Sequence, residues 1–90
     1  MQRLNLYYGR RPLGSDRQAS MLETHRSFTL TVGAIRRANG VVIVNATLAG
    51  GRERLVRSFC TVSEYSDPIA ACEHAVAELR RVVNHLLAVN

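Results

Sequence analysis

The sequence predicts an α+β fold in which a three-stranded antiparallel meander packs against one long C-terminal helix. Two patterns predict it: a helical apolar period over the last third of the chain, and three alternating apolar runs directly before it. The length agrees, because 90 residues suffice for one domain with a thin core. We expect a flexible or partly ordered tail at residues 1–14 and a single domain over residues 15–90.

The C-terminal helix is expected over residues 68–87. Asp67 and Pro68 suit its start, because a carboxylate can accept free amide hydrogens and proline lacks an amide that would need a partner. Apolar residues spaced three and four apart form one face, and they are Ile69, Cys72, Val76, Leu79, Val83 and Leu86. A polar stripe that we expect in solvent consists of His74, Glu78, Arg81 and His85.

Three strands are expected at residues 28–34, 41–48 and 52–62. A three-residue loop at residues 38–40 between the first two pairs Leu30 with Leu48 and keeps one continuous apolar face. Gly40 then occupies the left-handed position that such a loop needs.

A two-residue turn at Gly50 and Gly51 is expected to lead into the third strand. It places Arg57 opposite Val44 on the nominal core face, where an unpaired arginine is costly. Arg57 therefore lies toward the rim, marks a bulge or, as we favour, pairs with Glu73 or Glu78 of the helix.

A short N-terminal helix is expected over residues 15–24, which gives the element order α-β-β-β-α. Ser15 followed by Gln18 three residues later is a capping-box pattern. Ten residues are marginal for a helix without tertiary support, so packing against the rest of the domain is needed.

Catalytic and metal sites have no signature in the sequence. The seven carboxylates are scattered singly, and His74 and His85 lie about 16 Å apart along the helix axis, too far to share a metal. Phosphate loops, dinucleotide fingerprints and nucleophile elbows are missing. Cys60 and Cys72 both lie in apolar patterns, which predicts reduced, buried thiols. We expect no enzyme, no cofactor and no metal.

Localisation follows from the absence of long apolar stretches. No apolar run approaches the roughly 20 residues of a membrane span, and the N-terminus lacks the apolar stretch of a signal peptide. We expect a small bacterial-type protein in the cytoplasm with no membrane contact.

The sheet face away from the helix is expected to carry an apolar patch. Ile35 would lie beside Ile43 and Val41 beside Cys60, with Val62 on the same side. Such a patch usually needs cover, and small sheets with open edges commonly dimerise. We therefore expect a non-catalytic binding or assembly protein that acts as a homodimer or with a protein partner. The alternative cover is the N-terminal segment, with Leu4, Leu6, Tyr7 and Tyr8.

Nucleic-acid (RNA or DNA) binding is the alternative function. All twelve basic residues are arginine, and the net charge is +5. Arginine pairs with phosphate bidentately, although a GC-rich codon bias would produce the same composition. The candidate contacts are Arg10, Arg11, Arg36, Arg37, Arg52 and Arg54.

The expected order of helix, three strands and helix resembles that of the double-stranded RNA-binding domain. This resemblance implies RNA contacts through the first helix and the loop between the first two strands. The chain departs from that family at the entrance to the last helix, where residues 66–70 read Ser-Asp-Pro-Ile-Ala instead of a lysine-rich segment.

Overall fold

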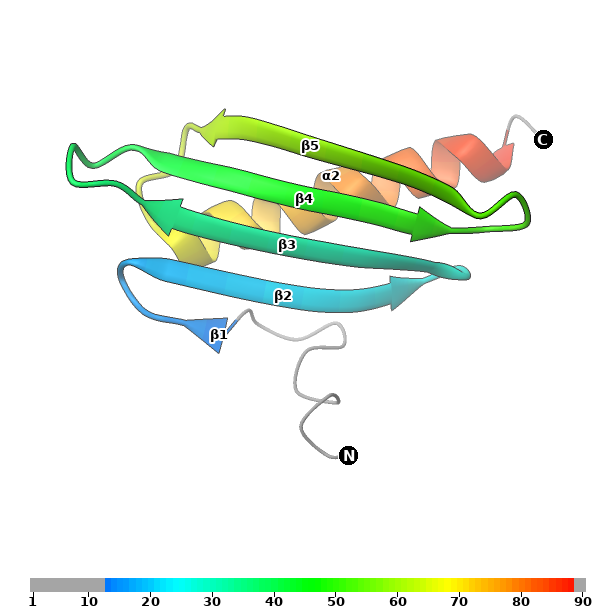
Figure 1. Ribbon diagram of the computed structural model, residues 1–90, viewed down its shortest axis with the longest axis horizontal. Coiled ribbons are helices and arrows are strands. Elements are labelled where there is room, and N and C mark those ends of the chain that lie inside the picture. Colours follow the sequence, from blue (N-terminus) through cyan, green and yellow to red (C-terminus); the bar gives the residue numbers. More distant parts are fainter. Residues whose placement is uncertain (1–12, 89–90) are drawn as a thin grey trace.

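Residues 13–88, which the computed structural model describes, form a five-stranded antiparallel sheet and one long helix (Figure 1). The elements are β1 (Leu13–Gly14), β2 (Gln18–His25), β3 (Phe28–Arg36), β4 (Val42–Gly50), β5 (Leu55–Ser63) and α2 (Pro68–Ala88). The strands lie in the sheet in chain order, as a meander. The predicted α+β class, meander and C-terminal helix are confirmed, whereas the predicted number of strands is too low.

The predicted N-terminal helix at residues 15–24 is wrong, because β2 occupies residues 18–25 and pairs along its length with β3. The Ser15 hydroxyl does accept a backbone amide hydrogen, but from Arg17, at 3.2 Å, within a turn. The order α-β-β-β-α therefore fails over residues 13–88, and with it the topological resemblance to the RNA-binding domain. The predicted tail falls mainly on residues 1–12, outside the described residues.

The turn between β2 and β3 consists of Arg26 and Ser27, which both have positive φ angles, of 51° and 75°. Two such residues match the twist of a two-residue hairpin, although Asn-Gly is the usual pair. Asn84 of α2 supports the turn, since its Oδ1 accepts a hydrogen bond from Arg26 Nη1 at 3.1 Å and lies 3.1 Å from His25 Nε2. The first full hairpin is thereby tied to the C-terminal half of the helix.

Replacing Ser27 with glycine is expected to raise the free energy of unfolding by about 0.5–1 kcal/mol. A non-glycine residue in the left-handed region costs about 1–2 kcal/mol, which exceeds the entropy that glycine adds to the unfolded chain. Urea unfolding followed by circular dichroism measures the change. An unchanged or lower stability would contradict the strain assigned to this turn.

The predicted β3–β4 hairpin is confirmed in both register and loop. Leu30 pairs with Leu48, the Arg37 amide donates to the Val41 carbonyl at 2.7 Å, and Gly40 has a φ of 88°. The predicted two-residue turn between β4 and β5 is wrong, because residues 51–54 form the connection. The longer turn shifts β5, so that Arg57 pairs with Leu48 instead of Val44.

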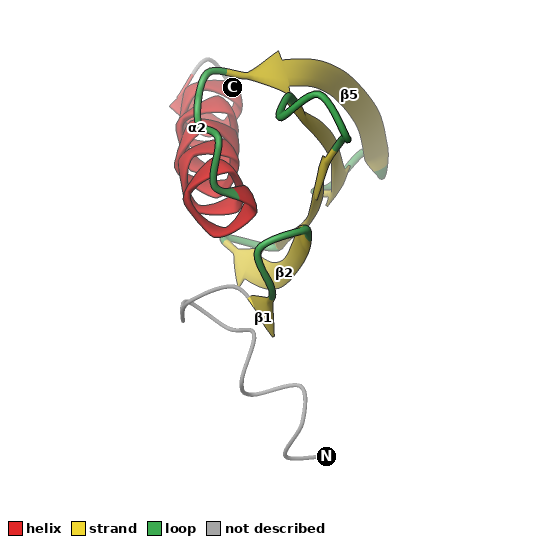
Figure 2. Cartoon of the chain, turned by 90° about the vertical axis from the view of Figure 1, so that its left-hand side faces the viewer, coloured by secondary structure: helices red, strands yellow, loops and turns green. Residues whose placement is uncertain are grey.

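Helix α2 lies across one face of the sheet, over β2, β3 and β4 (Figure 2). Its predicted start is confirmed, because the Ile69 amide donates to Asp67 Oδ1 at 3.3 Å. The core between the layers contains residues from every second position of these strands together with Ala71, Cys72, Val76, Leu79 and Val83 of the helix. The predicted apolar and polar faces of the helix are thus confirmed. No helix within residues 13–88 has an apolar stretch long enough to cross a membrane.

Candidate functional site

Of the four long strands, β5 is the one that contributes no buried residue to the core, although its first residue, Leu55, packs against the core half-buried. Strands β2, β3 and β4 bury alternate residues under the helix, whereas β5 has no buried residue. Phe59 on its helix-facing side is 40% exposed, and Val56 and Val62 on the opposite side are 66% and 63% exposed. Large apolar side chains exposed on both faces of one strand indicate an interaction site. We call residues 55–63, with the outer edge of this strand, the β5 surface.

The outer edge of β5 has no partner strand among residues 13–88. In an antiparallel ladder, hydrogen-bonded pairs alternate with pairs that are not hydrogen-bonded. The backbone amide of Arg37 donates a hydrogen bond to the carbonyl of Val41 at the β3–β4 hairpin. The odd-numbered residues of β4 therefore form backbone hydrogen bonds with β3, and the even-numbered residues form them with β5. Odd residues of β5 therefore bond to β4. The backbone groups that face the free edge belong to Val56, Ser58, Cys60 and Val62.

An apolar groove of about 630 Å³ separates β5 from the helix. Phe59 and Thr61 line it from β5, and Ala75, Leu79 and Val82 line it from α2. The groove exists because the sheet is wider than one helix can cover. Its polar rim includes His74 and Glu78. Glu78 forms a salt bridge with Arg81 and lies 3.9 Å from His74.

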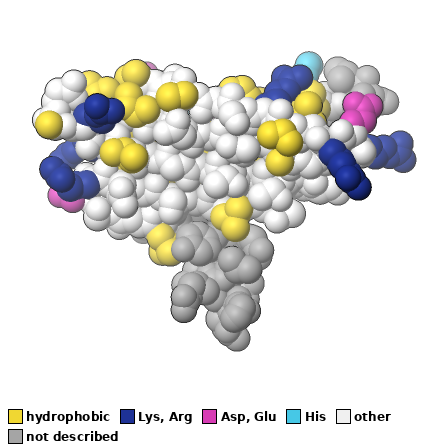
Figure 3. All heavy atoms as spheres, in the orientation of Figure 1, with side chains coloured by type: hydrophobic (Ala, Val, Ile, Leu, Met, Phe, Trp, Pro, Cys, Tyr) yellow, Lys and Arg dark blue, Asp and Glu magenta, His cyan; other side chains and the backbone are white. Residues whose placement is uncertain are grey.

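The predicted patch on the far face of the sheet is present only in part. Ile35 pairs with Ile43, as predicted, and Ile43 pairs with Val62. The predicted contact between Val41 and Cys60 is wrong, because Cys60 pairs with Asn45. The row of Ile35, Ile43 and Val62 therefore lies toward the β3–β4 hairpin, and hydrophobic side chains are visible at both ends of the far face (Figure 3). Mainly polar side chains, beside Leu22 of β2, lie in the middle of this face: Ser20, Thr31, Asn45, Thr47 and Ser58.

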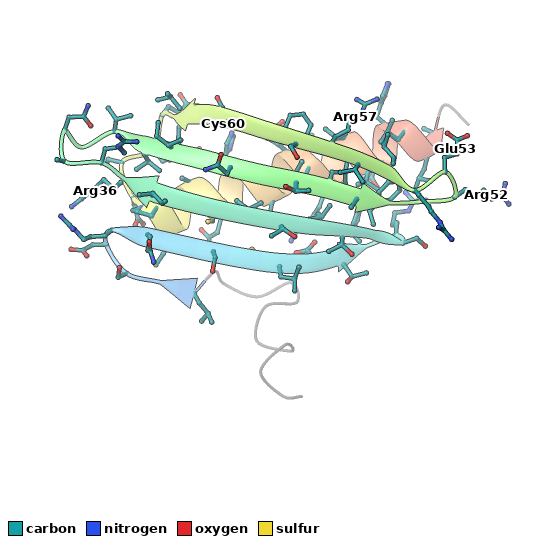
Figure 4. All side chains as sticks on the ribbon, viewed as in Figure 1. Arg36, Arg52, Glu53, Arg57 and Cys60 are labelled. Atoms are coloured by element: carbon teal, nitrogen blue, oxygen red, sulfur yellow. The ribbon has the colours of Figure 1, made fainter. Side chains whose placement is uncertain are left out.

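Arg57 lies on the helix-facing side of β5 but is exposed (Figure 4). The favoured ion pair with Glu73 or Glu78 is wrong: among the described residues, Arg57 forms no salt bridge, and Glu78 is bonded to Arg81 instead. The shifted β5 register places Arg57 toward the turn at residues 51–54. Of the three placements considered from the sequence, the rim is the one observed.

The candidate nucleic-acid contacts fall into two groups at opposite ends of the sheet. Arg36 and Arg37 lie at the β3–β4 end, whereas Arg52 and Arg54 lie in the β4–β5 turn, and the labelled Arg36 and Arg52 show this separation (Figure 4). Arg10 and Arg11 lie outside the described residues. The arginines that can be placed do not converge on one surface.

Comparison with known proteins does not assign the chain to a family. No family model, curated protein or solved structure matches the chain. A role must therefore be argued from the residues themselves, and the β5 surface is the feature that the core does not explain.

One partly buried ion pair, missed by the sequence analysis, links β2 to the helix. Glu23 is on the helix-facing side of β2, and its carboxylate accepts hydrogen bonds of 2.6 Å from both Nε and Nη2 of Arg80. These hydrogen bonds raise the pKa of Arg80 above its ordinary value. Both partners are thereby satisfied. No cluster of metal-ligating side chains occurs within residues 13–88.

The two cysteines differ in environment. Cys72 is buried, as predicted, whereas Cys60 is exposed, so the prediction of two buried thiols is half wrong. Burial, with a smaller contribution from the charge of Glu73, raises the pKa of Cys72 from 9.0 to about 11. Cys60 is exposed because it lies on the far face of β5, where neither the helix nor another strand covers it.

The protein is expected to lose about 2 kcal/mol of stability through Cys72 as the pH rises from 9 to 11. The unfolded thiol ionises near pH 9, while the folded thiol keeps its proton to about pH 11. In that window the unfolded state binds fewer protons, so stability falls with rising pH. Urea midpoints at pH 8, 9.5 and 11 measure the slope. Cys72→Ala should have a shallower slope; an equal slope in both proteins would contradict the assignment.

Proposed function

We propose that this chain is a non-catalytic assembly protein that joins protein chains by strand addition at the β5 surface. The observation that supports it most is a nine-residue outer strand exposed on both faces, with no partner strand within residues 13–88. A strand laid along this edge would satisfy the outward amides and carbonyls and cover apolar side chains on both faces. Strand addition is a common mode of protein recognition, in which the backbone supplies affinity and the side chains supply specificity.

The absence of edge protection on β5 favours this proposal. Proteins usually protect an edge with proline, with several charges, with a bulge or by shortening the strand. Strand β5 has no proline, pairs without a bulge over its whole length, and has Arg57 as its one charged residue. The opposite side of the sheet ends in β1, which has two residues. An unprotected long edge is expected in a protein that uses the edge for binding.

Nucleic-acid binding ranks second. Its candidate arginines lie at opposite ends of the strands, and the far face between them has neutral polar side chains. Phosphate contacts on a continuous strip of cations would have favoured that function. The β5 surface instead combines exposed apolar area with unpaired backbone groups, which suits a polypeptide partner.

Amide hydrogen exchange measured by NMR on the full-length protein tests the proposal. The amides of Val56, Ser58, Cys60 and Val62 point away from β4. On a free edge they should therefore exchange as fast as the amides of residues 52 and 53 in the β4–β5 turn, which donate no backbone hydrogen bond within residues 13–88. Strand addition should slow them at least about a hundredfold, to the level of Arg57, Phe59 and Thr61, which bond to β4. Fast exchange of all four at millimolar protein concentration would overturn strand addition at β5.

A further inference from the structure

We infer that the strand added at β5 is β5 of a second copy of this chain, in a symmetric dimer whose two-fold axis passes beside Phe59. This inference rests on the proposed assembly function and names its partner. It makes the interface isologous, so that the same nine residues serve both sides. The argument proceeds from backbone register to side chains and then to charges.

The backbone and the length of β5 together leave three registers that pair most of the strand. Even-numbered residues of β5 carry the outward amides and carbonyls, so each must pair with an even-numbered residue of the second copy. This rule allows an axis beside any residue of β5, and the three axes that pair the most residues pass beside Ser58, Phe59 or Cys60. An axis beside Phe59 pairs all nine residues of each strand, Leu55 to Ser63. Either other axis leaves two residues of each strand unpaired.

Side chains on both faces match in the register centred on Phe59. On the far face, Val56 lies opposite Val62 of the second copy, and these are the most exposed large apolar residues of the strand. On the helix side, Phe59 lies opposite Phe59 of the second copy, beside the groove. Both matches place apolar side chains within the close spacing of cross-strand pairs.

Charges at the ends of the strand favour the same register. Arg54 directly precedes β5 and Glu64 directly follows it, so each Arg54 comes opposite Glu64 of the second copy. An axis beside Cys60 would instead place Val56 opposite Glu64, and an axis beside Ser58 would place Val62 opposite Arg54. Only the register centred on Phe59 pairs both valines with valine and both charges with opposite charges.

The dimer also explains the position of Arg57. In the register centred on Phe59, Arg57 lies opposite Thr61 of the second copy, on the helix-facing side. Thr61 lines the groove together with His74 and Glu78. Arg57 is thereby placed beside the polar rim of the second copy's groove, whereas in its own chain it forms no salt bridge within residues 13–88. In this dimer, Arg57 on the helix-facing side of β5 therefore contacts the second copy.

A charge exchange tests the pairing of Arg54 with Glu64. Within one chain these residues lie at opposite ends of β5, about 30 Å apart, so they cannot compensate each other. In sedimentation equilibrium, Arg54→Glu alone and Glu64→Arg alone should each weaken the dimer about tenfold. The variant with both changes should return to within about threefold of the wild type, because each new charge then faces its opposite in the second copy.

Disulfide cross-linking tests the register itself. In a Cys60→Ser background, Phe59→Cys places two thiols on residues whose Cα atoms lie about 4.5 Å apart, within the range of a disulfide. The matched control, Arg57→Cys in the same background, places them about 13 Å apart along the strand. Mild oxidation should link the first variant as a dimer and leave the control unlinked. Circular dichroism of each variant checks that the fold is retained.

Four other outcomes would overturn the symmetric β5 dimer. They also show whether strand addition at β5, the proposed function, survives without it. Cross-linking of the wild type through Cys60 would place the axis beside Cys60. Dissociation by Ile43→Glu without any effect of Arg54→Glu would move the interface to the far face. A monomer at millimolar concentration with protected β5 edge amides would show that the added strand comes from the same chain. A monomer with unprotected edge amides would remove the proposed function as well.

Discussion

Replacing Arg80 with methionine is expected to lower the free energy of unfolding by about 2–3 kcal/mol. Glu23 is 5% exposed, and its carboxylate accepts two hydrogen bonds of 2.6 Å from Arg80. Methionine keeps the packing of the aliphatic stem but removes both donors. A carboxylate is then left in the core without its counter-charge, which is the costly way to break such a pair.

Removing the charge of Glu23 instead of that of Arg80 should cost less stability, and this difference makes the prediction specific. The Arg80 side chain is 39% exposed, so after Glu23→Gln its guanidinium can be hydrated, and we expect a loss of about 1 kcal/mol. The double variant Glu23→Leu with Arg80→Met should recover most of the stability lost in Arg80→Met, because no buried charge remains. Urea unfolding at one fixed protein concentration measures all three. Equal losses for Arg80→Met and Glu23→Gln would contradict this account.

The same ion pair explains why β2 could not be predicted from the sequence. Ala19 and Met21 continue the alternation of a strand, but Glu23 then falls on the helix-facing side. The partner that permits this, Arg80, lies 57 positions further along the chain. The turn after β2 gives no signal either, because Arg26 and Ser27 adopt positive φ angles without glycine or asparagine. Local patterns therefore favoured a short helix there.

Other elements could be predicted because their determinants are local. The helix from Pro68 to Ala88 depends on its own apolar period and on Asp67 at its start. The β3–β4 register follows from continuity of one apolar face and from Gly40 in the loop. These features require no knowledge of a distant residue.

The exposure of the helix-facing side of β5 could not be predicted for a different reason. Its sequence has apolar residues on both faces, which is typical of a strand covered on both sides. Cover depends on how many strands one helix can span, and the unpredicted β2 lies under the helix. With β2 added to the sheet, β5 lies beyond the helix. Because β2 was not predicted, the exposure of Phe59 on the helix-facing side of β5 was not predicted either.

The second large loss of stability is expected where the β2–β3 turn meets the end of β4, and a series of three glycine variants tests it. Gly50 has a φ of 133°, and a Cβ added there would lie 2.5 Å from the Ser27 carbonyl oxygen and 3.0 Å from Phe28 Cα. Both contacts are with backbone, which cannot move away as a flexible side chain can. Gly50→Ala should therefore lower the free energy of unfolding by about 3 kcal/mol or more.

Two other glycines serve as controls that separate the cost of a positive φ from the cost of a steric clash. Gly40 has a φ of 88°, and a Cβ there meets no atom within 4 Å, so Gly40→Ala should cost about 1 kcal/mol from strain alone. Gly33 lies within β3 with open space and no positive φ, so Gly33→Ala should be neutral or stabilise by up to about 1 kcal/mol. Thermal unfolding by circular dichroism should rank the midpoints Gly33→Ala, Gly40→Ala, Gly50→Ala from highest to lowest. A Gly50→Ala midpoint equal to that of Gly40→Ala would show that the β2–β3 turn does not press against the end of β4.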